Sequence, residues 1–243
     1  MTQSARTAVV LFTENIDAVR TFYGAHTRLT ASPLVVPSNA FFPDAVNHPM
    51  LALKLIESPI FFVEHRRTES EIAEQSQTAA LPIASSINPV DLKVESAQAA
   101  ARVGGLVFPG NAPPVYYEAK EPPLTFLRGQ LPEDIFPSLD SLQPSVAVFR
   151  TADQEMLAKF FLPGETMWTR EKHGKGPWHY AHSMGCSHLP VHADKFVVEI
   201  YPVRKTAPAC AVELFFAPHL LLGATSITDP DGRRLVPFHF EPN

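Results

Sequence analysis

The chain has 243 residues, of which 45% are hydrophobic and 19% are charged, and its formal net charge is −5. This is the composition of an ordinary soluble globular protein, and the weakly acidic balance without a long basic run argues against nucleic acid or an acidic membrane as a partner. No apolar stretch approaches the roughly 20 residues needed to span a bilayer, and the first residues lack the apolar core of a signal peptide, so we expect a cytoplasmic protein.

A segment near the N-terminus returns 138 positions later, as residues 10–23 and 148–161. Apolar strand residues, a helix-capping position and an aromatic pair recur in register, which predicts a strand followed by a helix in both copies. A later run also recurs, 60–64 against 195–199, at an offset of 135. A duplicated unit is the simplest cause, and the chain length favours two domains of about 120 residues.

In chain order, the first unit opens with a strand at Ala8–Thr13 and continues with a helix that is capped near Asn15 and ends at Gly24. Three short β-rich runs follow, at 29–36, 50–56 and 60–65. The predicted order of this unit is βαβββ.

The second unit is predicted to repeat this order over residues 88–128. Its predicted elements are a strand at 88–94, a helix at 96–103, and strands at 106–108, 115–119 and 124–128. A proline-rich segment, 131–144, then forms a linker that no helix can cross.

The third unit spans 145–203, and a shortened fourth unit spans 209–240. The fourth contains a strand at Val212–Phe216 and a hairpin closed by Asp229-Pro-Asp-Gly232. Proline sets φ at the first corner of such a turn and glycine supplies a positive φ at its end. We therefore predict a first domain at 1–130, the linker at 131–144, and a second domain at 145–243.

Three segments, 16–23, 92–105 and 229–235, resemble the vicinal oxygen chelate superfamily, which includes glyoxalase I, extradiol dioxygenases, fosfomycin-resistance transferases and bleomycin-resistance proteins. The resemblance implies an α+β fold in which tandem βαβββ modules form half-barrel sheets around a small-molecule cavity, in two related domains. It also implies a homodimer. Members of this superfamily commonly hold a divalent metal through a His or Gln on the first strand and a Glu on the last strand of each unit.

The expected first-strand ligand positions fall near Ala8, Pro89 and Val146, none of which can bind a metal. The last strands do offer Glu64 and Glu199 in the first and third units. The usual metal site is therefore not expected, and each carboxylate has the alternative of facing solvent or pairing with a neighbouring Arg.

Residues 178–192 hold four of the ten histidines, His179, His182, His188 and His192. Imidazoles at this density can bind Zn, Fe or Ni. Against this, an extended strand would place His179 and His182 on opposite sides. The alternative is that these are strand and loop histidines at the rim of the cavity.

Aromatic side chains are the other candidates for ligand contacts. The candidate ligand-binding residues are Trp178, Tyr180, Phe215 and Phe238. Aromatic walls hold flat apolar ligands in cavities, although each of these residues could equally fill the core.

Three functional hypotheses follow. The first is a lyase, isomerase or dioxygenase that uses one divalent metal, Fe, Zn, Mn or Ni. Its candidate ligands are His179, His182, His188, Glu199 and His239. The second is a metal-free protein that sequesters a small molecule, as bleomycin-resistance proteins do, and the missing first-strand ligands favour it. A weaker third hypothesis is a structural or regulatory dimer with a collapsed cavity.

Overall fold

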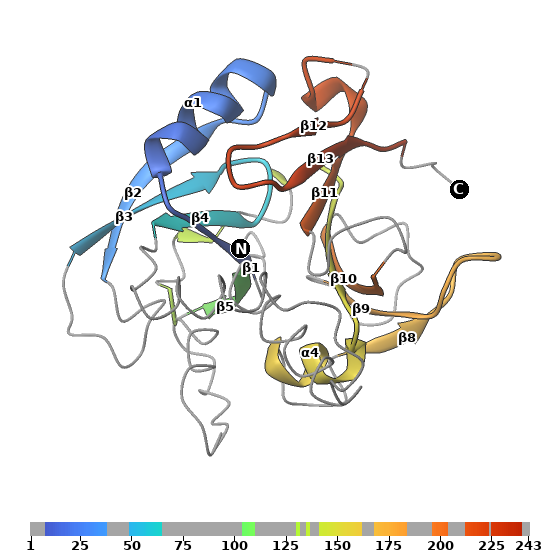
Figure 1. Cartoon of the computed structure of the whole chain (residues 1–243). Coiled ribbons are helices and arrows are strands. Elements are labelled where there is room, and N and C mark those ends of the chain that lie inside the picture. The colour runs from blue at the N-terminus through green and yellow to red at the C-terminus, as the bar shows by residue number, and fades with distance from the viewer. Residues whose placement is uncertain are drawn as a thin grey trace, which may run out of the picture.

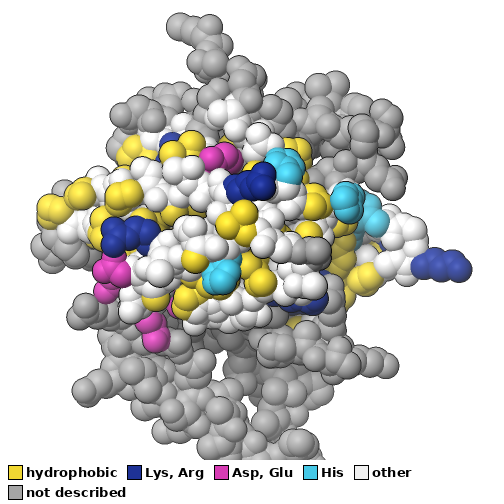
Figure 2. Space-filling model, turned by 90° about the horizontal axis from the view of Figure 1, so that it is seen from above, with side chains coloured by type: hydrophobic (Ala, Val, Ile, Leu, Met, Phe, Trp, Pro, Cys, Tyr) yellow, Lys and Arg dark blue, Asp and Glu magenta, His cyan; other side chains and the backbone are white. Residues whose placement is uncertain are grey.

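The computed structural model describes residues 8–37, 49–64, 104–109, 130–131, 135–136, 141–161, 168–183, 196–203, 212–223 and 225–239. These residues form two β-sheets and few helices (Figure 1), a mixed composition compatible with the expected α+β class. Within them, no helix has the length and apolar character that crossing a membrane requires. On the face seen in Figure 2, the charged side chains of the described residues are scattered and form no single patch.

The first sheet has the strand order β2-β3-β4-β1-β5-β6. Its elements, with the helix that follows the first strand, are β1 Ala8–Thr13, α1 Ile16–His26, β2 Ala31–Pro37, β3 Pro49–Leu55, β4 Ile60–Glu64, β5 Gly104–Pro109 and β6 Gln130–Leu131. Strand β1 is parallel to β4 and antiparallel to β5. Of the second unit's predicted elements, only the strand near 106–108 lies within the described residues, and it is part of β5.

The second sheet has the strand order β12-β13-β11-β7-β10-β9-β8. Its elements, with the two helices between them, are β7 Ser145–Thr151, α4 Gln154–Phe161, β8 Thr169–Glu171, β9 His179–Ser183, β10 Phe196–Pro202, β11 Val212–Phe216, η7 Pro218–Leu220, β12 Ile227–Thr228 and β13 Arg234–Pro237. Strand β7 is parallel to β10 and antiparallel to β11, which is the same relationship that β1 has to β4 and β5.

The two helices that follow the first strands begin in the same way. The side-chain oxygen of Asn15 accepts a hydrogen bond from the backbone N–H three residues later at 3.0 Å, and Asp153 does the same at α4, also at 3.0 Å. Thr13 and Thr151, two residues before these caps, each accept from the cap residue's N–H at 3.2 Å. The recurrence predicted from the sequence therefore extends to the hydrogen bonds that start each helix.

The predicted end of α1 at Gly24 is wrong, because the helix continues to His26. Thr27 ends it in an extended conformation, with φ −134° and ψ 164°. The N–H and the hydroxyl of Thr27 both donate to the carbonyl of Tyr23, at 3.0 and 2.7 Å. A side chain that satisfies a terminal carbonyl thus replaces the glycine signal on which the prediction relied.

The predicted offset of 135 for the later run is also wrong. Val10 lies opposite Phe61 in the first sheet, and Val148 lies opposite Glu199 in the second. Val148 follows Val10 by 138 positions, and Glu199 follows Phe61 by 138 positions. The offset between the first strands of the two units therefore also applies to their last strands. The residue equivalent to Glu199 is therefore Phe61 and not Glu64.

The turn predicted at Asp229-Pro-Asp-Gly232 is confirmed. Gly232 has a φ of +81°, and its N–H donates to the carbonyl of Asp229 at 3.0 Å. The Asp229 carboxylate accepts from the backbone N–H groups of Asp231 and Arg233, at 3.0 and 2.9 Å. This turn closes the antiparallel pair β12–β13.

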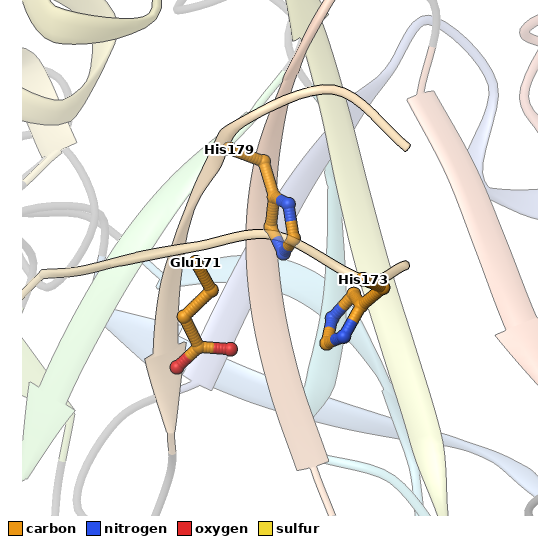
Figure 3. Close-up of side chains that lie close together, drawn as sticks. All are labelled: Glu171, His173 and His179. Atoms are coloured by element: carbon orange, nitrogen blue, oxygen red, sulfur yellow. The ribbon is translucent and has the colours of Figure 1, made fainter. Parts of the chain in front are cut away.

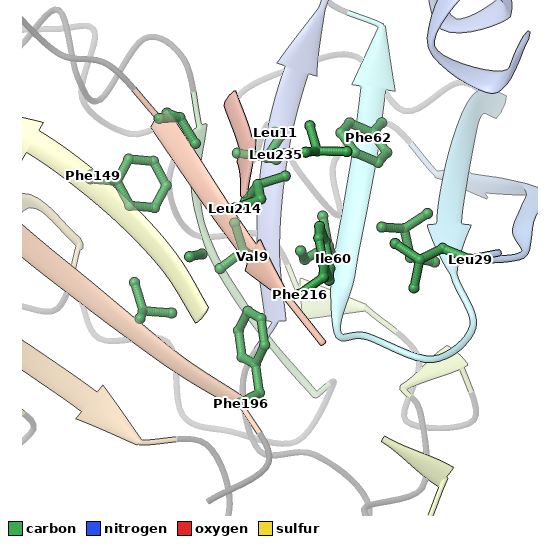
Figure 4. Packing of buried hydrophobic residues seen from close by; sticks show 14 of the residues in the cluster. Val9, Leu11, Leu29, Ile60, Phe62, Phe149, Phe196, Leu214, Phe216 and Leu235 are labelled. Carbon is green, nitrogen blue, oxygen red and sulfur yellow. The ribbon is translucent and has the colours of Figure 1, made fainter. Parts of the chain in front are cut away.

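One hydrophobic cluster draws its residues from both sheets (Figure 4). Its labelled members include Val9, Leu11, Ile60 and Phe62 from the first sheet and Phe149, Phe196, Leu214, Phe216 and Leu235 from the second. Hydrogen bonds also join the halves: the N–H of Arg28 donates to the carbonyl of Leu220 at 2.8 Å, and Arg233 Nη1 donates to the carbonyl of Phe12 at 2.9 Å. The division at 131–144 stays a prediction.

Candidate metal centre

The β8–β9 hairpin brings three potential metal ligands together. Glu171 of β8 lies directly opposite His179 of β9. His173, two residues after Glu171, points to the same side of the hairpin (Figure 3), and one ligand atom from each of the three residues lies within 4.8 Å of the others. Two segments of one hairpin thus supply a carboxylate and two imidazoles.

A second carboxylate approaches from the neighbouring strand β10. Glu199 Oε1 lies 3.6 Å from the Nε2 atom of His173 and 3.6 Å from the Nε2 atom of His179. These distances are those of ion pairs and exceed the range of a good hydrogen bond. The side chain of His179 is completely buried, that of Glu199 is 14% exposed, and that of His173 is 54% exposed. We call Glu171, His173, His179 and Glu199 the hairpin cluster.

The imidazole of His179 has contacts on each side. Its ring lies 4.8 Å from that of His173 and 4.2 Å from that of Tyr201, measured between ring centroids, and it is nearly parallel to the tyrosine at 9°. Nδ1 lies 3.4 Å from the carbonyl oxygen of Pro177, which can only accept a hydrogen bond. This contact favours the proton on Nδ1 and leaves Nε2 directed toward Glu199.

The pKa of His179 reflects two opposing effects. Burial of the ring disfavours the charged form, but the adjacent Glu199 carboxylate, with smaller help from Pro177 and Glu171, outweighs it and raises the pKa above its ordinary value. For Tyr201, burial and then the charge of Glu199 raise the pKa of the phenol. In the metal-free protein the cluster therefore attracts a proton to His179.

The donor atoms fit a divalent transition metal. Imidazole nitrogen and carboxylate oxygen suit Zn, Fe, Mn and Ni. Two ligands of a tetrahedral zinc ion, each roughly 2.0 to 2.1 Å from it, lie roughly 3.4 Å apart. The 3.6 Å spacing of Glu199 from each imidazole is close to this value. The Pro177 carbonyl beside Nδ1 of His179 is the kind of outer partner that orients a metal-binding histidine.

A small cavity of about 250 Å³ lies at the start of α4. It is lined by Ala152, Asp153, Gln154, Glu155, Arg170, His179 and Tyr180. Its lining is mostly polar and includes charges of both signs. Of the four cluster residues, His179 alone is among the described residues that line it, and Arg170 and Tyr180 lie on the face of the hairpin opposite Glu171 and His179.

The predicted metal ligands are only partly brought together. His179 and Glu199 meet in the hairpin cluster. His182 lies opposite Val198, which belongs to the core, and its ring is 5.6 Å from that of the buried Trp168, so His179 and His182 face opposite sides of the sheet. His239 is exposed beyond β13, which is separated from β9 by three strands. His188 lies outside the described residues.

Two of the predicted ligand-binding aromatics lie apart from the cluster face. Trp178 is 52% exposed, with Arg170 and Lys172 over its ring at 5.4 and 5.9 Å. Tyr180 lies opposite Ile200 and packs against the core.

The other two aromatics contact each other. The rings of Phe215 and Phe238 meet edge to face, with centroids 5.9 Å apart and an angle of 88°. Phe215 of β11 lies opposite Val146 of β7, and Val146 lies opposite Val197 of β10. Val197 is two residues before Glu199 on β10. Since side chains two apart on a strand share a face, Phe215 lies on the face of the sheet that carries Glu199. We call Phe215, Phe238, Val146 and Val197 the apolar ledge.

Sequence reasoning missed Glu171 and His173. The signal that could have found them is the Glu-x-His spacing, which places both side chains on one face if the segment is extended. Their meeting with His179 depends on the hairpin register, which pairs Glu171 with His179.

Comparison with family models, with curated proteins and with solved structures found no match to this chain.

Proposed function

We propose that this chain binds one divalent transition metal at the hairpin cluster and uses it to hold a small molecule, as a vicinal-oxygen-chelate-like protein. The observation that carries the proposal is the convergence of Glu171, His173 and His179 within 4.8 Å, with one oxygen of Glu199 placed 3.6 Å from both imidazoles. Paired histidines with carboxylates are a common donor set for these metals.

The strand order supports the family part of the proposal. Residues 8–64 and 145–202 each follow the order strand, helix and three strands, and in each the first strand pairs in parallel with the last. Glu199 lies on the last strand of its unit, where the resemblance expects a ligand carboxylate. Ala8 and Val146, on the first strands, cannot bind a metal. The β8–β9 hairpin would supply the missing ligands.

The chemistry of the site would be shared between the ion and the chain. A bound divalent metal supplies a Lewis acid that polarises a ligand oxygen. The Pro177 carbonyl contacts Nδ1 of His179, and the complete burial of this side chain would keep water from its Nε2 atom. The apolar ledge on the same face would contact the carbon skeleton of the ligand. A lyase, isomerase or dioxygenase would be compatible with such a site.

The test is metal content of the untagged protein after separate loading with Zn, Fe, Mn and Ni, followed by dialysis. We expect about one ion per chain in the wild type, and a loss of affinity in His179→Ala and in Glu171→Gln. The matched control is His219→Ala, because His219 is exposed on η7, away from the hairpin. Wild-type protein that retains none of the four metals would reject the proposal.

The apolar ledge favours a second candidate function, a metal-free binding protein for a flat apolar molecule. Phe238 is 45% exposed beside Phe215, so one aromatic face is available next to a second. The probe is a fluorescent naphthalene dye, added in the presence of a chelator. This function predicts dye binding that Phe238→Ala removes and that Leu222→Ala, a change at a similarly exposed apolar residue, leaves intact.

A further inference from the structure

Tyr201 lies in the middle of a stack of side chains that crosses three strands. The guanidinium carbon of Arg150 on β7 lies 5.3 Å from the centroid of its ring, and the ring of His179 on β9 lies 4.2 Å from it. Strands β7 and β9 flank β10 on opposite sides, so the phenol ring has a neighbour on each side. His173 continues the stack beyond His179, at 4.8 Å.

The Arg150 end of the stack is held firmly. Its Nε and Nη2 atoms lie 2.7 and 2.5 Å from Glu213 Oε2, and Nη1 donates to the carbonyl of Pro202 at 3.4 Å. The side chains of Arg150 and Glu213 are 6% and 5% exposed. A buried guanidinium with these partners has little freedom to move, and it limits the movement of the ring packed against it.

The stack restricts the orientation of His179. The Tyr201 ring, stacked at 4.2 Å, restricts rotation of the imidazole about its Cβ–Cγ bond. The Pro177 carbonyl contacts Nδ1 and so favours the ring orientation in which Nδ1 faces Pro177. Together these two contacts leave Nε2 pointing at Glu199. The hydroxyl of Tyr201 is 3.5 Å from Nε2, at the limit of a hydrogen bond, so the ring and not the hydroxyl provides the restraint.

We propose that Tyr201 is a positioning residue for the hairpin cluster: its ring, anchored by Arg150, holds the His179 imidazole in the orientation that binds a metal. The inference rests on the proposed function. Tyr201 would not contact the metal itself. It would raise the affinity for the metal, because an imidazole that is already held in place loses less rotational freedom when the metal binds.

The test compares three variants by competition with a metal-binding dye for Zn²⁺. Tyr201→Phe keeps the ring and is expected to keep wild-type affinity, whereas Tyr201→Leu removes the flat surface and is expected to weaken binding by about 10- to 100-fold. The matched control is Tyr180→Leu, since Tyr180 lies on the adjacent strand but packs against the core. Its affinity should match the wild type even where its stability falls.

A second measurement separates positioning from general loss of structure. The visible absorption spectrum of bound Co²⁺ reports the geometry of the ligands, so it should be unchanged in Tyr201→Phe and altered in Tyr201→Leu. If Tyr201→Leu does not fold by circular dichroism, Tyr201→Met serves in its place, because methionine fills the space without a flat ring.

Two results would overturn the inference. One is wild-type affinity and spectrum in the leucine or methionine variant. The other is an equal loss in Tyr201→Phe, which would assign the effect to the hydroxyl. Failure of the proposed function looks different, because the wild type itself would then bind no Zn²⁺ or Co²⁺.

Discussion

Arg150 of β7 and Glu213 of β11 form an ion pair between neighbouring strands, and both side chains are almost completely buried. Glu213→Gln would leave the guanidinium buried without its counter-charge. We expect this change to lower the free energy of unfolding by about 3 to 5 kcal/mol. Urea denaturation followed by circular dichroism measures it.

The control for this pair is Arg234→Gln. Arg234 is 48% exposed and its Nη1 atom lies 3.6 Å from the other oxygen of Glu213, so its removal should cost no more than about 1 kcal/mol. A loss in Glu213→Gln that is no larger than the loss in Arg234→Gln would mean that Arg150 finds another acceptor.

Tyr23 carries a hydroxyl that is fully buried and has no hydrogen-bond partner within the described residues. Burial raises the pKa of this phenol, so the group stays neutral. Because an unsatisfied buried hydroxyl costs roughly 1 to 3 kcal/mol, we expect Tyr23→Phe to leave the protein as stable as the wild type or more stable by about 1 kcal/mol. A clear loss of stability in thermal unfolding would show that the hydroxyl has a partner such as an ordered water.

The raised pKa of His179 links stability to pH in the metal-free protein. Since the folded state holds the proton more tightly than the unfolded chain, this contribution is fully present below the unfolded pKa of about 6.5 and is lost as pH rises through the higher folded value. Urea midpoints measured from about pH 5 to about pH 9 with a chelator present should show this decline. In Glu199→Gln the decline should be smaller, and parallel curves for the two proteins would contradict the assignment.

Gly24 and Gly232 provide a matched pair of substitutions. An added Cβ meets no atom within 4 Å at either position, but Gly232 has a φ of +81° and Gly24 lies in α1. Gly232→Ala should destabilise the protein by about 1 to 2 kcal/mol, because an L-residue is strained in that conformation. Gly24→Ala should stabilise it by about 0.5 to 1 kcal/mol, because alanine favours the helix. Thermal unfolding of both variants tests the contrast, and equal shifts in the same direction would contradict it.

Features set by local chemistry could be predicted from the sequence. The strands Ala8–Thr13 and Val212–Phe216 have the predicted bounds, and Asn15 caps its helix as predicted. The turn closed by Gly232 belongs to the same group. In each case the signal and the structure it produces lie within a few residues of each other.

The candidate site could be predicted from the sequence only in part, because its residues come from segments that are distant from one another in the chain. The sequence predicts His179 and Glu199 as metal ligands but not Glu171 and His173, because the approach of these two residues to His179 depends on the register of a hairpin. The density of histidines after Trp178 also predicts His182 as a ligand, but alternation along the strand turns its side chain toward the core. Register between strands is decided by packing across the sheet, which no single segment contains.

The hydrogen bond from Arg233 to the carbonyl of Phe12 spans 221 positions of the chain. During synthesis, the first strand must therefore emerge long before the residue that completes its contacts. Until then the apolar face that β1 and β4 present, including Leu11 and Phe62, has no second sheet to cover it. An uncovered apolar face of this kind favours aggregation of the nascent chain, and we expect contacts so distant in sequence to slow the completion of folding.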